Sequence, residues 1–300
     1  MKTTIYKSIE GKNRILNLYD SFQAGLGVIL GDRNVKTRFG ATHVLVAGPE
    51  HGLPIVITHG GNSIAPQGLR GLFPLLEQER YRVYAPDTIG HPGKSAQVRL
   101  SPRDQSYGLW LSDVLDGLGL EKSAFIGGSF GAGIILRLAA YAPQRITKMA
   151  LFVPSGIVSV PFVSMVFKVG LPYLVYTLFP SRKRMYRAIR WMGSDIEDDV
   201  LELIEAVFQH VRVEPEMPRP VTKEELGKFT APTLVIAAEN DVMFPGDAVK
   251  KRAIEIFTNL IDVECLQGGT HYSTKSDLEY VNKRIMEFFD EPEERKDKAA

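Results

Sequence analysis

The sequence has little of what marks the specialised protein classes. Its single cysteine, Cys265, excludes an internal disulfide and a cysteine-based metal cluster, and one thiol fits a reducing compartment. The formal net charge is only +1, from 36 Lys and Arg against 35 Asp and Glu, so no charge excess attracts nucleic acid. The first residues, MKTTIYKSIEGKNR, lack the apolar segment of a secretory signal. We therefore expect a cytoplasmic protein that does not bind nucleic acid.

The composition is that of a globular domain, with 44% hydrophobic and 24% charged residues. A chain of 300 residues is long enough for one large α/β domain with a substantial core. Short apolar runs alternate with amphipathic stretches, which is typical of a mostly parallel sheet with crossover helices. The eight predicted strands are 35–39, 43–48, 54–59, 81–87, 123–127, 148–153, 233–239 and 262–267, of which the first two form an antiparallel pair. Helices are predicted at 66–79, 104–118, 130–141, 246–258 and 276–289.

A long segment without this strand–helix rhythm follows the strand at 148–153. About 80 residues pass before the strand at 233–239, far more than an ordinary connection in an α/β fold contains. We interpret this segment as a helical cap inserted into the core. The predicted organisation is an N-terminal arm at 1–34, a catalytic core at 35–154 and 230–289, the cap at 155–229 and a charged, flexible tail at 290–300.

Charge is segregated along the cap. Residues 156–193 include six basic and no acidic side chains, whereas 194–210 include six acidic side chains and neither Lys nor Arg. In the acidic half, apolar residues repeat at helical spacing and predict one face for docking, with the acids on its solvated side. The repeating residues are Val200, Leu203, Ile204, Val207 and Phe208.

The segment 158–179 is apolar and almost long enough to cross a bilayer. A membrane span here would place the strands before and after the cap on opposite sides of the bilayer, although their pattern assigns them to one sheet. Lys168 and two prolines add to the cost of burial in lipid. We therefore predict an apolar cap helix over a pocket and no stable membrane insertion; a cap that touches a membrane surface is the alternative.

The strongest chemical signal is Gly127-Gly128-Ser129-Phe130-Gly131, a G-x-S-x-G pattern between an apolar strand and an apolar helix. This context is typical of a nucleophile elbow, in which a sharp turn projects the serine above the carboxyl edge of the sheet. Small flanking residues let the strand and the helix pass closely. A glycine-rich turn with a helix-capping serine is the simpler alternative.

A serine hydroxyl needs a base, and that base needs a carboxylate to orient it. Asp241 follows the strand at 233–239, and His271 lies in the loop after the last strand, which gives the chain order Ser129, Asp241, His271. Glu239 and Asp247 are rival acids, but Glu239 barely leaves its strand and Asp247 is placed to cap a helix.

An oxyanion site needs two backbone N–H groups. Phe130 and Gly61 are the predicted donors, with Asn62 as the alternative to Gly61. Three further polar residues at this edge receive other interpretations. His59 is expected to brace its loop, Asp87 to stabilise the turn that follows it, and His91 to lie at the pocket mouth or in a surface loop. Cys265, in a strand, is expected to be an inert core thiol.

These motifs resemble those of the α/β-hydrolase superfamily over about 35–289. The segments TRFGATHVLVAGPE, THGG and GLEKSAFIGGSFG are similar to those of capped bacterial serine carboxylesterases. The resemblance implies Ser129 as nucleophile, His271 as base, Asp241 as acid, and no cofactor or metal. It implies hydrolysis of small-molecule carboxylic esters.

An apolar and aromatic cap favours hydrophobic or aromatic esters. The cap residues concerned are Phe162, Met165, Phe167, Tyr173, Tyr176, Phe179, Trp191 and Met192. Three other functions stay open. The GGSFGA elbow also resembles that of proline iminopeptidases, in which case Glu202 or Glu205 would receive an α-amine. Cofactor-free perhydrolase or carbon–carbon bond hydrolase activity would use the same triad, and a vestigial ligand receptor would use none of it. Monomer and homodimer are equally compatible with the sequence.

Overall fold

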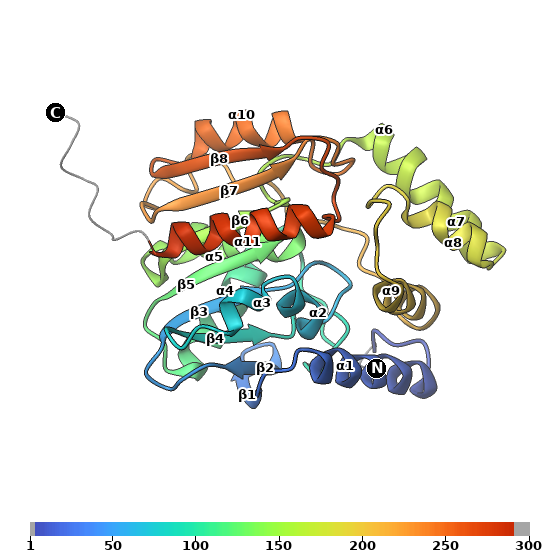
Figure 1. Cartoon of the computed structure of the whole chain (residues 1–300), viewed down its shortest axis with the longest axis horizontal. Coiled ribbons are helices and arrows are strands. Elements are labelled where there is room, and N and C mark those ends of the chain that lie inside the picture. The colour runs from blue at the N-terminus through green and yellow to red at the C-terminus, as the bar shows by residue number, and fades with distance from the viewer. Residues whose placement is uncertain (1–3, 291–300) are drawn as a thin grey trace.

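Eight strands form one mixed, mostly parallel sheet in the computed structural model of the chain, which describes residues 4–290 apart from the side chain of Phe73 (Figure 1). The strands are β1 (Gly31–Thr37), β2 (Gly40–Ala47), β3 (Leu53–Thr58), β4 (Tyr81–Pro86), β5 (Ser123–Gly128), β6 (Ile146–Phe152), β7 (Thr233–Ala238) and β8 (Leu260–Leu266). Their order is β1-β2-β4-β3-β5-β6-β7-β8, and only the β1–β2 and β2–β4 pairs are antiparallel. The predicted eight-stranded α/β fold is confirmed.

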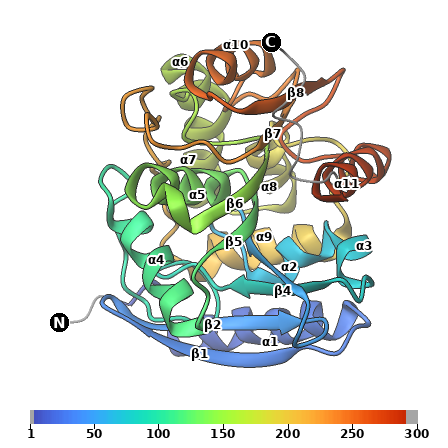
Figure 2. The same ribbon diagram turned by 90° about the vertical axis from the view of Figure 1, so that its left-hand side faces the viewer.

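Helices cover both faces of the sheet, because successive strand residues point to opposite sides. Val56 and Phe125 belong to one core with α4 (Ser106–Leu118), α5 (Phe130–Tyr141) and α10 (Gly246–Ile256). The next residues along these strands, Ile57 and Ile126, belong to a second core. The helices of that core include α1 (Ile9–Gly25), α2 (Ala65–Arg70), α3 (Phe73–Leu76) and α11 (Lys275–Asp290), and Figure 2 shows α4 and α5 across the sheet from α2, α3 and α11.

Two elements differ from the prediction. The helix expected at 66–79 is two short helices, α2 and α3, separated at Gly71 and Leu72. Strand β1 begins at Gly31 rather than at 35. The prediction missed its first four residues because they are exposed and carry no apolar signal. The tail expected at 290–300 lies outside the described residues, except for Asp290 at the end of α11.

The predicted N-terminal arm contains helix α1, which was not predicted. The Ser8 hydroxyl accepts a hydrogen bond from the Gly11 N–H at 3.0 Å and caps α1. Gly11 lies directly against His210, and Tyr6 pairs with Val211 in an isolated antiparallel bridge. Residues 6–11 are therefore packed against residues 210 and 211, at the end of α9.

The helical insert spans residues 162–210. It consists of α6 (Phe162–Ser164), a π-helical turn η2 (Met165–Gly170), α7 (Leu171–Leu178), α8 (Arg182–Ile189) and α9 (Asp198–His210). The predicted docking face of the acidic half is present, since Val200, Leu203 and Val207 of α9 are buried. Across residues 4–290 no helix has the length and apolar character that a membrane crossing requires. The apolar segment 158–179 forms α6, η2 and α7.

Candidate active site

Ser129 occupies a sharp turn between β5 and α5. Its φ of 50° and ψ of −117° are strained for a residue with a side chain, which is characteristic of functional turns. The flanking glycines are required sterically. A Cβ at Gly131 would clash with the backbone oxygen of Thr58, and one at Gly127 would lie 2.8 Å from the nitrogen of Ala132. Gly128 has open space at this position, so only the outer two glycines of the motif are needed for close passage.

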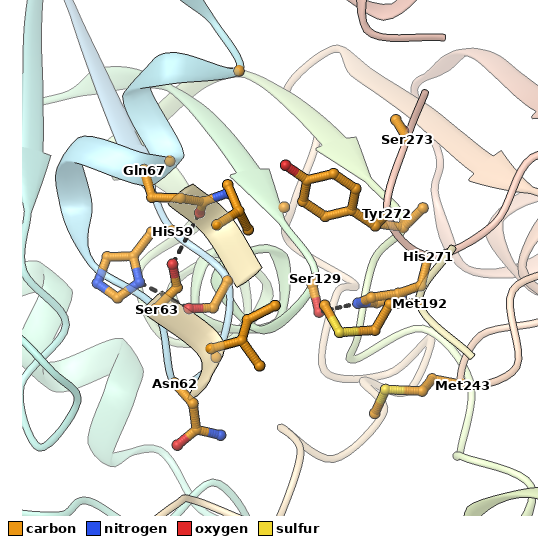
Figure 3. Close-up of a pocket in the computed structure, with 18 of the residues that line it drawn as sticks. His59, Asn62, Ser63, Gln67, Ser129, Met192, Met243, His271, Tyr272 and Ser273 are labelled. Carbon is orange, nitrogen blue, oxygen red and sulfur yellow. Dashed lines mark hydrogen bonds between the residues drawn. The ribbon is translucent and has the colours of Figure 1, made fainter. Parts of the chain in front are cut away.

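The structure brings Ser129, His271 and Asp241 together. The Ser129 Oγ lies 3.0 Å from His271 Nε2, and His271 Nδ1 lies 2.8 Å from Asp241 Oδ2. Figure 3 shows the first of these contacts at the base of the pocket. The three residues follow β5, β8 and β7, whose carboxyl ends lie at one edge of the sheet.

Asp241 is held in one orientation. Its side chain is buried, and its Oδ1 accepts hydrogen bonds from the N–H groups of Met243 at 2.8 Å and Phe244 at 3.1 Å. These donors stabilise the ionised carboxylate. The remaining oxygen can then accept a hydrogen bond from His271 Nδ1–H, which leaves Nε2 free to accept the proton of Ser129.

The predicted oxyanion donors lie next to each other. A Cβ at Gly61 would lie 3.2 Å from the Phe130 Cβ, so the two residues are in van der Waals contact. Phe130 is the first residue of α5, and its N–H therefore has no partner within the helix. The alternative donor is engaged elsewhere, because the Asn62 N–H donates to His91 Nδ1 at 3.0 Å. Geometry therefore favours Gly61 over Asn62.

The loop that carries Gly61 is fastened from several sides. The Asn62 side chain accepts from the Glu214 N–H at 2.7 Å and donates to the Glu214 oxygen at 2.9 Å. His91 is buried and its ring lies 4.6 Å from that of Phe130, so the surface-loop interpretation of His91 is wrong. Segments distant in sequence cover the loop that carries His91, and the local composition of that loop does not reveal its burial. Burial, and to a lesser extent the nearby Arg99 guanidinium, holds the pKa of His91 well below its ordinary value.

His59 has the bracing role expected of it. Its Nε2 accepts a hydrogen bond from the Thr88 N–H at 3.0 Å, and its Nδ1 lies 2.8 Å from the oxygen of Gly60. Burial lowers the pKa of His59 and keeps the ring neutral, as the accepting role of Nε2 requires. This residue connects the Gly60–Gly61 turn to the turn that follows β4.

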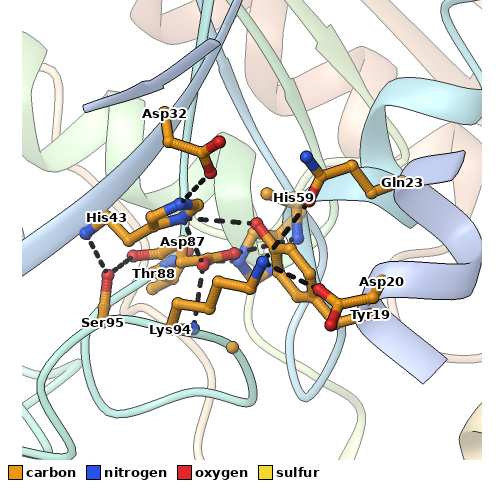
Figure 4. A network of polar contacts seen from close by, with 12 residues as sticks. Tyr19, Asp20, Gln23, Asp32, His43, His59, Asp87, Thr88, Lys94 and Ser95 are labelled. Atoms are coloured by element: carbon orange, nitrogen blue, oxygen red, sulfur yellow. Dashed lines mark hydrogen bonds and ion pairs between the residues drawn. The ribbon is translucent and has the colours of Figure 1, made fainter. Parts of the chain in front are cut away.

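Asp87 is structural, as expected. It is buried, and its carboxylate accepts from the Lys94 N–H at 2.9 Å and the Ala65 N–H at 3.3 Å and contacts His43 Nδ1 at 3.0 Å (Figure 4). Tyr19 of α1 reaches the same imidazole through its hydroxyl at 3.3 Å. Burial lowers the pKa of His43, but the hydrogen bonds and charges of Asp87 and Asp32 outweigh it, and the pKa is raised.

The rival acids lie outside this arrangement. Glu239 accepts a hydrogen bond from the Gly268 N–H at 2.7 Å, and Asp247 lies in the first turn of α10. Cys265 lies in β8, only partly buried, and the pKa of its thiol is raised by burial and by the charges of Asp247 and Glu239. A protonated thiol is a poor nucleophile, which agrees with its expected inert role. The expected core position is wrong, because the residue is only partly buried.

A cavity of about 540 Å³ lies between the sheet edge and the insert. Its lining is mostly apolar, and Ser129 and His271 face into it (Figure 3). Of the cap side chains expected to form it, four line the cavity: Met165, Tyr173, Trp191 and Met192. Tyr176 instead packs against Phe208, and Phe162, Phe167 and Phe179 point outward and are exposed, so this part of the prediction is wrong.

Each charged side chain that lines the described cavity has a polar partner. Arg70 forms an ion pair with Asp199, and Glu214 accepts a hydrogen bond from Arg99 at 2.8 Å. The Glu197 carboxylate accepts from the Tyr272 hydroxyl at 2.5 Å. The cavity therefore favours an uncharged ligand.

Two acids considered for amine recognition lie elsewhere. Glu202 is exposed and pairs with Arg14, and the half-buried Glu205 accepts a hydrogen bond from Gln209 at 3.2 Å. Neither residue lines the cavity. Sequence reasoning missed the connection between the insert and the loop of His271. Tyr272, directly after His271, donates its N–H to the Met192 oxygen at 2.6 Å and lines the cavity. The position of Tyr272 directly after the predicted base is the sequence signal that indicates a place at the site.

Comparison with known proteins agrees with this architecture. A family model described as alpha/beta hydrolase fold matches residues 54–223. The uncharacterized carboxylesterase nap of Bacillus subtilis (strain 168) is 29% identical over 267 residues, which cover 85% of each chain. A 2-hydroxymuconate semialdehyde hydrolase of Pseudomonas putida is 31% identical over 160 residues, covering 51% of this chain and 53% of the relative. The crystal structure of naproxen esterase from Bacillus subtilis superposes with a TM-score of 0.79 at 24% identity, covering 94% and 99% of the two chains.

Proposed function

Since the chain belongs to the α/β-hydrolase fold family, we propose that it is a serine hydrolase that cleaves carboxylic esters of hydrophobic or aromatic small molecules. One observation carries the proposal: Ser129, His271 and Asp241 form a continuous hydrogen-bonded chain that opens into an apolar cavity. The similarity of this chain to the carboxylesterase nap over 85% of its length supports the same reaction class.

The geometry accounts for each step. Ser129 Oγ attacks the ester carbonyl carbon while His271 Nε2 accepts its proton, and Asp241 stabilises the imidazolium that forms. The N–H groups of Phe130 and Gly61 receive the negative oxygen of the tetrahedral intermediate. Collapse of the intermediate breaks the bond to the alcohol, which takes the proton from His271. Water then hydrolyses the acyl-enzyme by the same sequence and releases the acid.

Cavity size and polarity define the substrate class. About 540 Å³ accommodates a small molecule with an aromatic or aliphatic group. The apolar walls gain free energy from contact with such groups, whereas a sugar or a phosphate would leave polar atoms unpaired. Ester bonds are neutral, which matches a cavity whose charged side chains already have partners.

Carbon–carbon bond hydrolysis is the second candidate, since a 2-hydroxymuconate semialdehyde hydrolase is among the relatives. The semialdehyde of a dicarboxylic acid carries a carboxylate and needs a cation in the site. Arg70 is the permanently charged cation among the described lining residues, and it is already paired with Asp199. This pairing favours the ester.

Replacement of the nucleophile tests the proposal. With p-nitrophenyl esters of increasing acyl length, Ser129→Ala should lose turnover by about 10⁶-fold and lose covalent labelling by a fluorophosphonate. Ser63→Ala, at another serine of the same cavity, should keep both. Labelled, active Ser129→Ala protein would contradict the assignment. Turnover of aminoacyl arylamides in place of esters would reassign the protein as an aminopeptidase, and turnover of a dienoate ketone would reassign it as a carbon–carbon bond hydrolase. Binding of an ester without turnover would support a ligand receptor.

A further inference from the structure

The insert exposes a row of large apolar side chains on its outer surface. Between α6 and the end of α7, six residues are 52–79% exposed: Phe162, Val163, Phe167, Leu174, Leu178 and Phe179. Figure 1 shows α6 and α7 at the periphery of the molecule, away from the sheet. Monomeric soluble proteins rarely expose contiguous apolar surface of this kind unless it meets a partner.

The row is not needed to form the cavity. The opposite side of the same helical segment carries Met165, Val169 and Tyr173, which line the cavity. Because all three line the cavity, they lie on one face of the segment. The segment therefore has one apolar face toward the cavity and another toward solvent, and only the second lacks an apolar partner among the described residues.

Positive charge borders the exposed row. Residues 156–193 include six Lys and Arg and no acid, and among the described residues none of the six forms an ion pair. The Arg184 guanidinium lies 5.6 Å from the Phe179 ring centroid and donates to the Phe179 oxygen at 3.1 Å, which places a cation at the end of the row. Lys183 and Arg187 of α8 are exposed nearby. The pKa of Arg182 is raised, chiefly by its hydrogen bond to the Tyr186 hydroxyl and to a lesser extent by the charges of Asp198 and Glu205 in α9.

We propose that this face of the insert docks onto an anionic lipid surface. Aromatic and aliphatic side chains enter the boundary between headgroups and acyl chains, while adjacent Lys and Arg side chains contact anionic headgroups. A second copy of the chain fits less well, because a symmetric contact of this segment with itself would oppose positive charges. Docking is peripheral, since the described helices are too short and insufficiently apolar to span a bilayer.

Docking has a consequence for the cavity, which rests on the proposed function. Because one helix separates the lipid-facing row from Met165, Val169 and Tyr173, a docked molecule holds its cavity beside the lipid. Esters that partition into the bilayer are then concentrated beside the cavity. The substrate class is thereby narrowed to lipophilic esters of low water solubility.

The docking is tested by sedimentation of the full chain with vesicles, a measurement independent of hydrolysis. We expect binding to phosphatidylcholine vesicles containing 30% phosphatidylglycerol, weaker binding to pure phosphatidylcholine, and release by salt. Phe167→Ser/Leu174→Ser should lower binding at least 10-fold, and Lys183→Gln/Arg187→Gln about 20-fold. Exposed residues on β1 and nearby provide matched controls: Arg33→Gln/Lys36→Gln, and Ile29→Ser for the apolar change.

All variants should retain the wild-type circular dichroism spectrum and hydrolysis of soluble p-nitrophenyl acetate, because none of the changed residues lines the cavity. Failure to bind either vesicle, or binding that the cap variants leave unchanged, would overturn the docking proposal while leaving the esterase proposal intact. A dimer abolished by Phe167→Ser/Leu174→Ser, without vesicle binding, would reassign the face to a second copy. Vesicle binding without ester turnover would instead remove the proposed function alone.

Discussion

The indole ring of Trp191 lies 5.4 Å from the imidazole ring of His271, so a side chain of the helical insert contacts the proposed base. The adjacent Met192 accepts a backbone hydrogen bond from Tyr272 at 2.6 Å, and Tyr272 reaches Glu197. Insert and core are thus joined at the proposed catalytic base. The insert consequently affects the orientation of His271 as well as the shape of the cavity.

Trp191→Ala should therefore lower kcat by about 10- to 100-fold, because a small displacement of His271 disrupts the approach to Ser129. Steady-state kinetics with a p-nitrophenyl ester measures the change. Trp191→Phe, which keeps an aromatic ring, should recover most of kcat. Tyr173→Ala, at a lining residue that packs on Phe208, should mainly raise KM. An effect of Trp191→Ala on KM alone would show that the indole only shapes the cavity.

Asp241→Asn should reduce kcat by about 10⁴-fold, since an amide can present a donor to His271 Nδ1 and favour the wrong tautomer. Its urea unfolding transition should stay cooperative. Glu239→Gln removes the rival carboxylate two residues earlier, which accepts a hydrogen bond from the Gly268 N–H, and should keep near wild-type kcat. The reverse result for these two variants would transfer the role of the acid to Glu239.

The elbow glycines should differ sharply in tolerance to alanine. Gly131→Ala introduces a Cβ into the backbone of Thr58, and we expect a loss of several kcal/mol in the free energy of unfolding. Gly128→Ala has open space and should change the free energy of unfolding by less than about 1 kcal/mol. Urea denaturation of both variants measures the difference. Equal losses in the free energy of unfolding for the two variants would mean that the close approach of β3 and α5 does not explain the glycine at position 131.

The sequence predicts those parts of the fold and the site that depend on local patterns of residues. Apolar runs located all eight strands within a few residues, and the positions of Asp241 and His271 after two of them placed both at one sheet edge. These are local signals. The helix at 9–25 was also predictable, because Ser8 is a typical cap and Ile15, Leu18, Tyr19 and Phe22 follow at helical spacing.

Side-chain direction in the insert was not predictable in the same way. Composition showed an apolar segment, but which residues face the cavity depends on how α6, η2 and α7 sit over the core. The π-helical turn at Met165–Gly170 also changes the spacing on which a helical projection relies. The burial of His91 similarly depends on Phe130 and Tyr107, which lie at least 16 residues away in the sequence.

His91 should also make the fold sensitive to acid. Because its pKa in the folded chain is well below the ordinary 6.5, the unfolded chain binds a proton first, and stability present above pH 6.5 is lost as pH falls below it. His91→Gln, whose amide oxygen can still accept from Asn62, should reduce the loss between pH 7.5 and 5.5 by up to about 1.4 kcal/mol. The opposite contribution of His43 is common to both proteins and cancels in the comparison. His51→Gln, at an exposed histidine, is the control, and a wild-type acid profile for His91→Gln in urea titrations would contradict the prediction.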